Sequence, residues 1–310
     1  MKQCLLGILA AAMIPASMPA RQTMVLPDLR KPHQIVVEGN DLYVFDEADY
    51  SLHGYTISPL SPKMTLGRKG EGPHDFQYLP FLFVHPQALV CTDFTKIIWF
   101  SRKGDVLRAM PFSALKDFDP SSEMFLVPTG DRFLRITADH GRLTRRVHLV
   151  DSGFTTIKML YEGPFVWMEG SRTDYRTDTV ASGGLVFVAD TFKGFYISIF
   201  DGNGTLLSTI DRSADMEQVP GRALLHQFCV SDGRIYATTY RKMDGRTEMI
   251  VLDLEGRILK RIYLPLASIR PQRGCLRYDL FTVSQGKLYE LVQNAGKGTW
   301  ELVVTDLEAM

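Results

Sequence analysis

The sequence has no excess of charge of either sign. Lysine and arginine together number 35, and so do aspartate and glutamate, so the formal net charge at pH 7 is zero. A chain without a net field has no general attraction to nucleic acid or to an anionic membrane surface. No long run of like charge occurs, and hydrophobic residues make up 45% of the chain, which is enough to build a core. We therefore expect a chain that folds throughout and has no nucleic-acid partner.

Cysteine is scarce, with four residues in 310. Cys4 falls in an N-terminal segment that we expect to be removed, which leaves Cys91, Cys229 and Cys275 and allows at most one disulfide. The three are widely separated and include no Cys-x-x-Cys pair. The sequence therefore predicts buried structural cysteines rather than a disulfide framework.

A segment long enough to span a bilayer is also missing. The apolar run at residues 4–14 has eleven residues, whereas a spanning helix needs about 20. This run follows one positive charge at Lys2 and precedes small residues between positions 15 and 20, which is typical of a signal peptide. We expect residues 1–20 to be removed and residues 21–310 to form a single exported domain, periplasmic or secreted, with no transmembrane segment.

The common catalytic signatures are absent. The chain contains no Gly-x-Ser-x-Gly, His-Glu-x-x-His, Walker or EF-hand pattern, so the usual hydrolase, zinc-protease, nucleotide and calcium sites lack their first requirement. Gly67, Gly70 and Gly72 are spaced wrongly for a phosphate loop and precede a predicted strand instead of a helix. These glycines favour an ordered connecting loop. The sequence identifies no catalytic residue, and we expect no metal and no cofactor.

What the sequence does contain is an internal repeat. A small turn followed by a short β-branched or aromatic run recurs six times. The turns are Gly39-Asn40-Asp41, His85-Pro86-Gln87, Thr129-Gly130-Asp131, Ser182-Gly183-Gly184, Ser231-Asp232-Gly233 and Ser284-Gln285-Gly286. Glycine and asparagine permit positive φ, and aspartate and serine bond their own backbone, so each turn predicts a hairpin between two strands.

A second hairpin follows each of these turns, and glycine usually closes it. The closing glycines Gly104, Gly153, Gly204 and Gly256 lie 49, 51 and 52 residues apart. Two hairpins per period give four strands, which make one propeller blade. About 290 residues remain after the N-terminal segment, and a period of about 50 gives about six blades. The sequence therefore predicts an all-β fold, a six-bladed β-propeller with four-stranded antiparallel blades.

The last blade needs a strand from elsewhere in the chain. The expected blades span residues 31–67, 79–113, 123–162, 178–211, 226–264 and 277–307. The sixth range has room for three strands only. The segment Thr23-Met24-Val25-Leu26-Pro27 resembles the outer strands of other blades, with proline where an edge strand tolerates a missing donor. We expect residues 22–28 to complete the C-terminal blade, close the ring and cover its exposed edge.

Two stretches, at residues 66–104 and 186–204, resemble the NHL repeat. The Gly-x-x-Gly-x-Gly-Pro element at residues 67–73 is also similar to the exported, TolB-like six-bladed propellers of Bacteroides-type gut bacteria, many of which have no assigned activity. The resemblance supports the fold and implies no particular function. Other blades depart from the NHL pattern. The fifth blade has Thr238-Thr239-Tyr240 at the place where the fourth blade matches the pattern with Ala189-Asp190.

Aspartates recur just after the second strand of a blade, at Asp46, Asp93, Asp139 and Asp190. A ring of carboxylates around the channel would bind cations, but a residue required once per blade more often bonds backbone N–H groups of the next turn. We expect this structural role. His33 and His226 open the innermost strands of the first and fifth blades, where a single histidine is more often a hydrogen-bonded structural residue than a ligand.

Function is expected on the crossings between blades, because the blades form a rigid ring while the crossings are free to vary. The longest crossings, at residues 162–178, 211–227 and 264–278, share one face with the loop at 68–78. Their tryptophan, tyrosine and arginine side chains are suited to stack on a sugar, pair a carboxylate or anchor a protein. The alternative is that they pack on their own blades. The candidate binding residues are Arg68, Tyr78, Trp167, Arg172, Tyr175, Arg222, His226, Arg273 and Tyr278.

The resulting hypothesis is a monomeric, exported binding or scaffold protein without chemistry of its own. Its loop-rich face would recognise a glycan or an envelope protein. The alternative is a propeller enzyme, such as a lactonase, a lyase or a glycan-cleaving enzyme, with its site at the mouth of the central channel. A metal held by His33, His226 and channel carboxylates would favour the enzyme.

Overall fold

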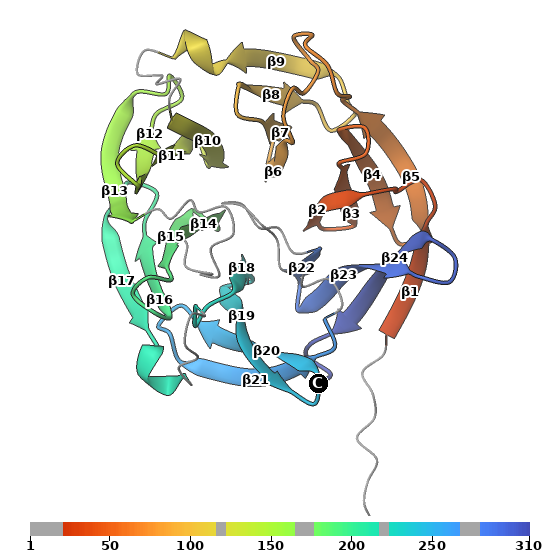
Figure 1. The fold of residues 1–310 in the computed structure, drawn as a ribbon, viewed down its shortest axis with the longest axis vertical. Helices are drawn as coiled ribbons and strands as arrows, with labels where there is room; N and C mark the ends of the chain where they lie inside the picture. The colour runs from red at the N-terminus through yellow and green to blue at the C-terminus, as the bar shows by residue number, and fades with distance from the viewer. Residues whose placement is uncertain (1–20, 116–121, 165–176, 217–222, 267–279) are drawn as a thin grey trace, which may run out of the picture.

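A computed structural model describes residues 21–115, 122–164, 177–216, 223–266 and 280–310. In these residues 24 strands form six four-stranded antiparallel sheets, which stand around a central axis like the blades of a propeller (Figure 1). The helical elements of the described residues are two short 3-10 turns, η1 (Phe112–Ala114) and η2 (Ser213–Asp215). No helix in these ranges has the length and apolar character needed to cross a membrane. The predicted all-β, six-bladed propeller is confirmed.

The strands of blades 1 to 5 follow chain order from the innermost to the outermost. Blade 1 contains β2 (Pro32–Glu38), β3 (Asp41–Asp46), β4 (Ser51–Ile57) and β5 (Leu60–Leu66). Blade 2 contains β6 (Phe81–His85), β7 (Ala88–Thr92), β8 (Lys96–Phe100) and β9 (Val106–Pro111). Blade 3 contains β10 (Ser122–Thr129), β11 (Arg132–Asp139), β12 (Thr144–Val150) and β13 (Thr156–Pro164).

The second half of the ring repeats this arrangement. Blade 4 contains β14 (Thr177–Ser182), β15 (Leu185–Asp190), β16 (Tyr196–Phe200) and β17 (Leu206–Asp211). Blade 5 contains β18 (Gln227–Ser231), β19 (Arg234–Met243), β20 (Arg246–Asp253) and β21 (Ile258–Leu264). Blade 6 contains β22 (Phe281–Ser284), β23 (Lys287–Asn294), β24 (Thr299–Asp306) and β1 (Arg21–Leu26). The predicted ranges of blades 1 to 5 differ from these bounds by no more than two residues at either end.

The first hairpin turn is tight in blades 4 to 6, where both of its central residues take positive φ. Asp232 and Gly233 have φ of 52° and 69°, and Gln285 and Gly286 have φ of 51° and 67°. Two successive positive values are characteristic of a type I′ turn, whose twist matches that of the two strands it joins. The recurring small residues are therefore the local cause of the recurring hairpins.

In blades 2 to 5 the second hairpin turn ends on a residue with positive φ. Gly104, Gly204 and Gly256 occupy this position as expected, with φ of 104°, 77° and 82°. In blade 3 the positive φ, 66°, falls on Phe154, so the assignment of Gly153 as the closing residue is wrong by one position. A bulky residue is strained in this region. The Phe154 side chain is buried among other aromatic rings, and this packing compensates for the strain.

Strand β1 is the outermost strand of blade 6, and it lies beside β24 from the other end of the chain (Figure 1). The two pair antiparallel over six residues, with Leu26 opposite Trp300. Leu26 and Leu29 are fully or almost fully buried in the core between blades 6 and 1. The Trp300 indole N–H donates a hydrogen bond of 3.2 Å to the carbonyl of Arg30. The segment of residues 22–28, which the sequence analysis assigns to the last blade, thus contacts blade 6 and blade 1.

The hydrophobic core lies between neighbouring blades. One cluster joins Phe187 and Ile197 of blade 4 to Ile235 and Ile250 of blade 5, all of them completely buried. The middle strands are buried on both faces, as in β3 and β7, whereas the outermost strands β9 and β17 are largely exposed. Because each sheet is packed on two sides, the ring is a rigid frame that holds the loops in place.

The two cysteines among the described residues lie on strands and form no disulfide. Cys91 is buried on β7 and Cys229 is half-buried on β18, and both are free thiols. Burial raises the pKa of both thiols, so they stay protonated and unreactive. Cys275 lies outside the described residues.

Candidate functional site

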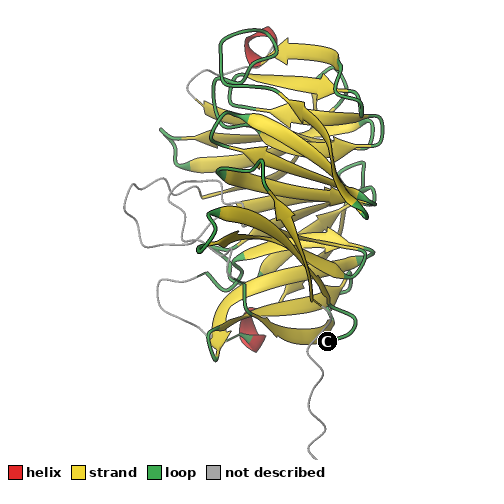
Figure 2. Ribbon diagram, turned by 90° about the vertical axis from the view of Figure 1, so that its right-hand side faces the viewer, coloured by secondary structure: helices red, strands yellow, loops and turns green. Residues whose placement is uncertain are grey.

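The two ends of the blades differ in what they carry. Because the strands alternate in direction, the two hairpin turns described above lie at one end of each blade. The turn between the second and third strands and the crossings from blade to blade lie at the other end, which we call the crossing face. Figure 2 shows the ring edge-on, with loops on both sides of the layer of strands.

Aspartates fasten the crossings to this face. The buried carboxylate of Asp46 accepts hydrogen bonds from the N–H of Lys31 in the crossing into blade 1 (3.0 Å) and from the N–H of Ala48 in the turn of its own blade (2.8 Å). Asp93 does the same in blade 2, accepting from the N–H groups of Gln77 (3.2 Å) and Thr95 (2.7 Å). The aspartates therefore have the structural role that the sequence predicts.

The turns of blades 3 and 4 follow the same rule. Asp139 accepts a hydrogen bond of 2.9 Å from the N–H of Arg142, and Asp190 accepts one of 3.1 Å from the N–H of Phe192.

Blade 5 departs from this pattern. Thr239 stands five residues after the start of its second strand, where Asp46 stands in blade 1 and Asp190 in blade 4. Its strand β19 has ten residues, against six in β3 and β15, and pairs with β20 again at Lys242 after an irregularity. The hairpin of β19 and β20 therefore extends beyond the point at which the other blades turn.

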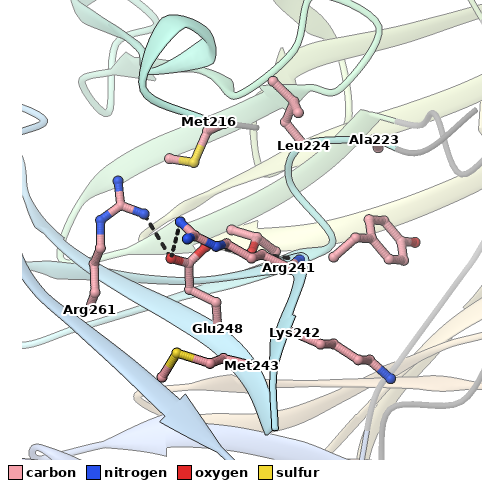
Figure 3. Close-up of a pocket in the computed structure, with 10 residues that line it drawn as sticks. Met216, Ala223, Leu224, Arg241, Lys242, Met243, Glu248 and Arg261 are labelled. Atoms are coloured by element: carbon pink, nitrogen blue, oxygen red, sulfur yellow. Dashed lines mark hydrogen bonds and ion pairs between the residues drawn. The ribbon is translucent and has the colours of Figure 1, made fainter. Parts of the chain in front are cut away.

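A pocket with a volume of about 330 Å³ lies between this extended hairpin and the crossing into blade 5 (Figure 3). Half of its lining is charged or polar and half is apolar or aromatic. The lining residues are Thr239, Arg241, Lys242, Glu248 and Arg261, together with Met216, Ala223, Leu224, Tyr240 and Met243. The volume is at the lower end of the range of small-molecule sites, about 300–1,000 Å³.

Glu248 on β20 is the centre of the polar half. Its side chain is 1% exposed. Oε1 accepts a hydrogen bond of 2.8 Å from the Arg261 guanidinium, and Oε2 accepts one of 2.8 Å from the Thr239 hydroxyl. Arg241 forms a longer ion pair of 3.9 Å with Oε1 (Figure 3). The Tyr263 hydroxyl lies 3.4 Å from the same oxygen. Strands β19, β20 and β21 each contribute a group, so the sheet register itself assembles the cluster.

The structure describes three of the nine candidate binding residues. Arg68 is exposed, and its guanidinium donates a hydrogen bond of 2.9 Å to Asp75 in the same loop. Tyr78 is half-exposed, and its ring lies 5.8 Å from that of Phe94. His226 is buried. The other six, Trp167, Arg172, Tyr175, Arg222, Arg273 and Tyr278, lie outside the described residues.

These three residues do not form one site. Arg68 and Tyr78 lie in the crossing between blades 1 and 2, whereas His226 lies in the crossing between blades 4 and 5, on the opposite side of a six-membered ring. His226 adjoins the pocket, because its ring lies 4.7 Å from that of Tyr240, which lines it. Of the described candidate residues, His226 thus lies near the pocket. The charged residues of the pocket lining are not among the candidates.

The glycine-rich loop after blade 1 is an ordered crossing. A Cβ added at Gly70 or Gly72 would come within 2.5 Å or 2.7 Å of the Asp75 carboxylate, which accepts a hydrogen bond from the Gly72 N–H at 3.2 Å. Phe76, next in the chain, is almost fully buried against Phe45. The glycines thus permit the loop to close around Asp75, and they form no phosphate loop.

His33 and His226 lie in separate neighbourhoods. His33 on β2 packs against Phe81 of blade 2, and the ring of His226 packs against Tyr240 of blade 5. Within the part of the chain that the structure describes, no three His, Cys, Asp or Glu side chains lie close enough to hold a metal ion.

Burial lowers the pKa of His33 to about 4, against a partial opposing effect of Glu47. Below pH 6.5 the unfolded chain binds a proton at this position that the folded protein does not bind, so the free energy of unfolding falls as the pH falls from 6.5 to 4. We expect a loss of about 3 kcal/mol across this interval. Urea titrations at several pH values should show a shallower slope for His33→Gln, whereas His74→Gln, at an exposed position, should keep the slope of the wild type. Equal slopes for all three proteins would contradict the assignment.

The charged residues of the pocket were not among the sequence-predicted candidates. Arg241, Glu248 and Arg261 lie on strands of one blade instead of on a long crossing. A signal for them exists in the sequence, because Thr238-Thr239-Tyr240 departs from the repeat at the point where blades 1 to 4 have aspartate.

Comparison with known proteins gives matches at the level of structure only. No protein-family model and no curated protein matches the chain. A member of the DUF4221 family from Bacteroides vulgatus superposes with a TM-score of 0.59 at 11% identity. A protein from Bacteroides fragilis that is described as exported superposes with a TM-score of 0.54 at 13% identity, and a luciferin-regenerating enzyme with 0.54 at 11%. Each of these alignments covers 93% of this chain and 96% of the other.

Identities this low show a shared fold and nothing more. An enzyme and a protein described as exported both have this fold, so the fold does not determine the function. The assignment to the NHL or TolB-like type stays a prediction. The chain is thus a six-bladed propeller similar in structure to Bacteroides proteins of unknown function.

Proposed function

We propose that the chain is an exported, non-catalytic binding protein whose crossing face recognises a glycan in the pocket of blade 5. After removal of residues 1–20 as a signal peptide, residues 21–310 act as one domain. Export is supported by the layout of the first twenty residues and by the structural neighbour described as exported.

The departure of blade 5 from the repeat is the observation that supports this proposal most. The aspartates of blades 1 and 2 bond to the crossings into their blades, whereas blade 5 has a pocket beside its crossing, lined half by polar and half by apolar or aromatic side chains. A sugar has the same division, because its hydroxyl edges form hydrogen bonds and its C–H faces pack on apolar side chains. The rigid ring holds such a site in shape before the ligand arrives, which reduces the entropic cost of binding.

A glycan array probed with the protein tests this function. We expect binding to a subset of glycans and a loss of at least about tenfold in affinity for the double variant Arg241→Ala/Met243→Ala, because it truncates two contacts of the pocket. Both side chains are about half exposed, so the melting temperature should stay close to that of the wild type.

The matched control is Arg257→Ala/Leu259→Ala, which removes an exposed arginine and an exposed aliphatic side chain from the same blade, neither of which lines the pocket. It should bind as the wild type does. Equal binding by the two double variants would place the site elsewhere. The variant Trp167→Ala/Arg172→Ala/Tyr175→Ala tests the sequence-predicted loop in the same assay, and intact binding would remove those residues from the site.

The remaining outcomes exclude the proposal. An array without any bound glycan, together with one envelope protein bound directly and in purified form, would favour the protein-binding alternative. Conversion of a bound glycan into a product would identify an enzyme.

A further inference from the structure

The pocket of blade 5 contains more positive than negative charge. Among the described residues of its lining, Arg241, Lys242 and Arg261 are basic, and Glu248 is the one acidic residue. The formal charge of the lining is therefore three positive less one negative, or +2. A cationic cavity attracts anions and raises their local concentration, most strongly where apolar walls lower the local dielectric.

Both oxygens of the Glu248 carboxylate accept hydrogen bonds from groups other than Arg241. Oε1 is bonded to Arg261 and Oε2 to Thr239, both at 2.8 Å. Arg241 stands 3.9 Å from Oε1, which is an ion-pair distance but too long for a hydrogen bond. Its side chain is about half exposed, and the described residues offer it no nearer carboxylate. The planar donors of Arg241 are thus directed to the pocket with their hydrogen-bonding capacity largely unused.

Arg261 and Arg241 consequently differ in role. Arg261 is held at hydrogen-bonding distance by a buried carboxylate and is a fixed part of the wall. Arg241 is restrained only loosely, so it is able to turn to an anion of the ligand without breaking a hydrogen bond inside the protein. Lys242, next along β19, also lines the pocket, and its side chain extends away from the Arg241 guanidinium in Figure 3, so it contributes positive charge to the pocket without sharing the position of Arg241.

The apolar half of the lining limits the kind of anion. Met216 and Met243 appear on either side of Glu248 and Arg241 in Figure 3, with Leu224 beyond Met216. Methionine packs adaptably against irregular apolar faces. A bare inorganic ion has no apolar surface to pack on the methionine and leucine side chains. The apolar chain of a long-chain lipid anion would lie against the charged residues of the lining, which is unfavourable. A sugar ring with one anionic substituent matches both halves.

We infer that the ligand of this pocket is an acidic sugar, with its oxyanion bound by Arg241 and its ring packed on the apolar side chains of the lining. This inference rests on the proposed function and narrows it to one class of glycan. The guanidinium of an arginine donates paired hydrogen bonds to a carboxylate and to a sulfate ester with similar geometry. The experiment separates these two sources of negative charge.

Isothermal titration with three oligosaccharide probes tests the inference. The probes are a galacturonate oligosaccharide, its carboxyl-reduced neutral counterpart and a galactose oligosaccharide bearing 6-sulfate. We expect the wild type to bind at least one anionic probe about tenfold more tightly than the neutral counterpart, the usual effect of a charge-assisted hydrogen bond. This preference should shrink as the salt concentration rises.

The substitution Arg241→Gln should remove most of the preference for the anionic probes, because it removes the positive charge and the planar fork that bind the oxyanion. Arg257→Gln makes the same change of charge on blade 5 at an exposed position that does not line the pocket, and it should keep the preference. Lys242→Gln should lower the affinity for the anionic probes by a smaller factor, since lysine is a point charge without the planar fork.

Two results would overturn the inference and leave the proposed function standing. One is equal affinity for the neutral and both anionic probes, and the other is an equal preference in Arg241→Gln and in Arg257→Gln. The absence of binding by every glycan on the array is the separate result that would overturn the proposed function as well.

Discussion

A protein of residues 30–310 is expected not to fold cooperatively, in contrast to one of residues 21–310. The missing residues form β1, the fourth strand of blade 6, and they include Leu26 and Leu29 of the core between blades 6 and 1. The loss of two buried leucines alone costs about 4–10 kcal/mol, which is comparable to the whole stability of a typical protein, about 5–15 kcal/mol. The deletion also exposes the edge of β24 to intermolecular pairing. Calorimetry should show a broad or absent melting transition and light scattering should show aggregates.

Two point substitutions in β1 test whether the buried side chain of this strand stabilises the protein. Leu26→Ala should lower the free energy of unfolding by about 2–5 kcal/mol, because the side chain is completely buried. Val25→Ala, one residue earlier and 46% exposed, should change it by less than about 0.5 kcal/mol. A synthetic peptide of residues 21–29 should restore a melting transition to the shortened protein. An unchanged transition in the shortened protein would show that the ring does not depend on this strand.

The substitution Glu248→Gln is expected to lower the free energy of unfolding by about 2–4 kcal/mol, because it removes the charge opposite Arg261 in a buried ion pair. The value is below the full cost of breaking a buried pair, since Arg261 is 31% exposed and water compensates part of its charge. The Thr239 hydroxyl also loses its charged acceptor. Urea denaturation of the two proteins measures the difference.

Glu255→Gln is the matched control for this experiment. Glu255 belongs to the same blade and pairs with Arg257, but its side chain is 70% exposed, so the substitution should cost less than about 1 kcal/mol. The double variant Glu248→Gln/Arg261→Met should be less destabilised than the sum of its single variants, because it leaves no uncompensated charge. Equal effects of Glu248→Gln and Glu255→Gln would show that the cluster contributes no more than a surface ion pair.

The architecture was predictable because the information that determines it is local and repeated. A type I′ turn needs two residues that accept positive φ, and the pairs Asp232-Gly233 and Gln285-Gly286 satisfy that need within the turn itself. Six short turns between strands, each followed by a second hairpin, favour a ring of four-stranded sheets in which every strand is paired.

Local information was insufficient in blade 3. Gly153 satisfies the pattern of a closing glycine, yet the left-handed position is taken by Phe154. The cost of a phenylalanine there is met by its burial in the core that Trp99 and Phe133 share. That compensation comes from residues more than twenty positions away in the chain, so no reading of the turn alone was able to include it.

The pocket was only partly accessible from the sequence. The departure at Thr239 marks blade 5 as different, but the consequence depends on the pairing of β19 with β20 and of β20 with β21. This register brings Arg241, Glu248 and Arg261 to one place, although each by itself is an ordinary charged residue on a strand. The candidate residues chosen for their type on long crossings lie on different sides of the ring or outside the described residues.

The sequence by itself determined the number of blades, the positions of the hairpins and the structural role of the aspartates, because turn conformation and strand alternation depend on neighbouring residues. The tertiary structure decided where one blade opens into a pocket and which charges meet there. The physical reason is that electrostatic and packing energies depend on distance in space, and residues of separate strands acquire that distance only when the sheet register is set.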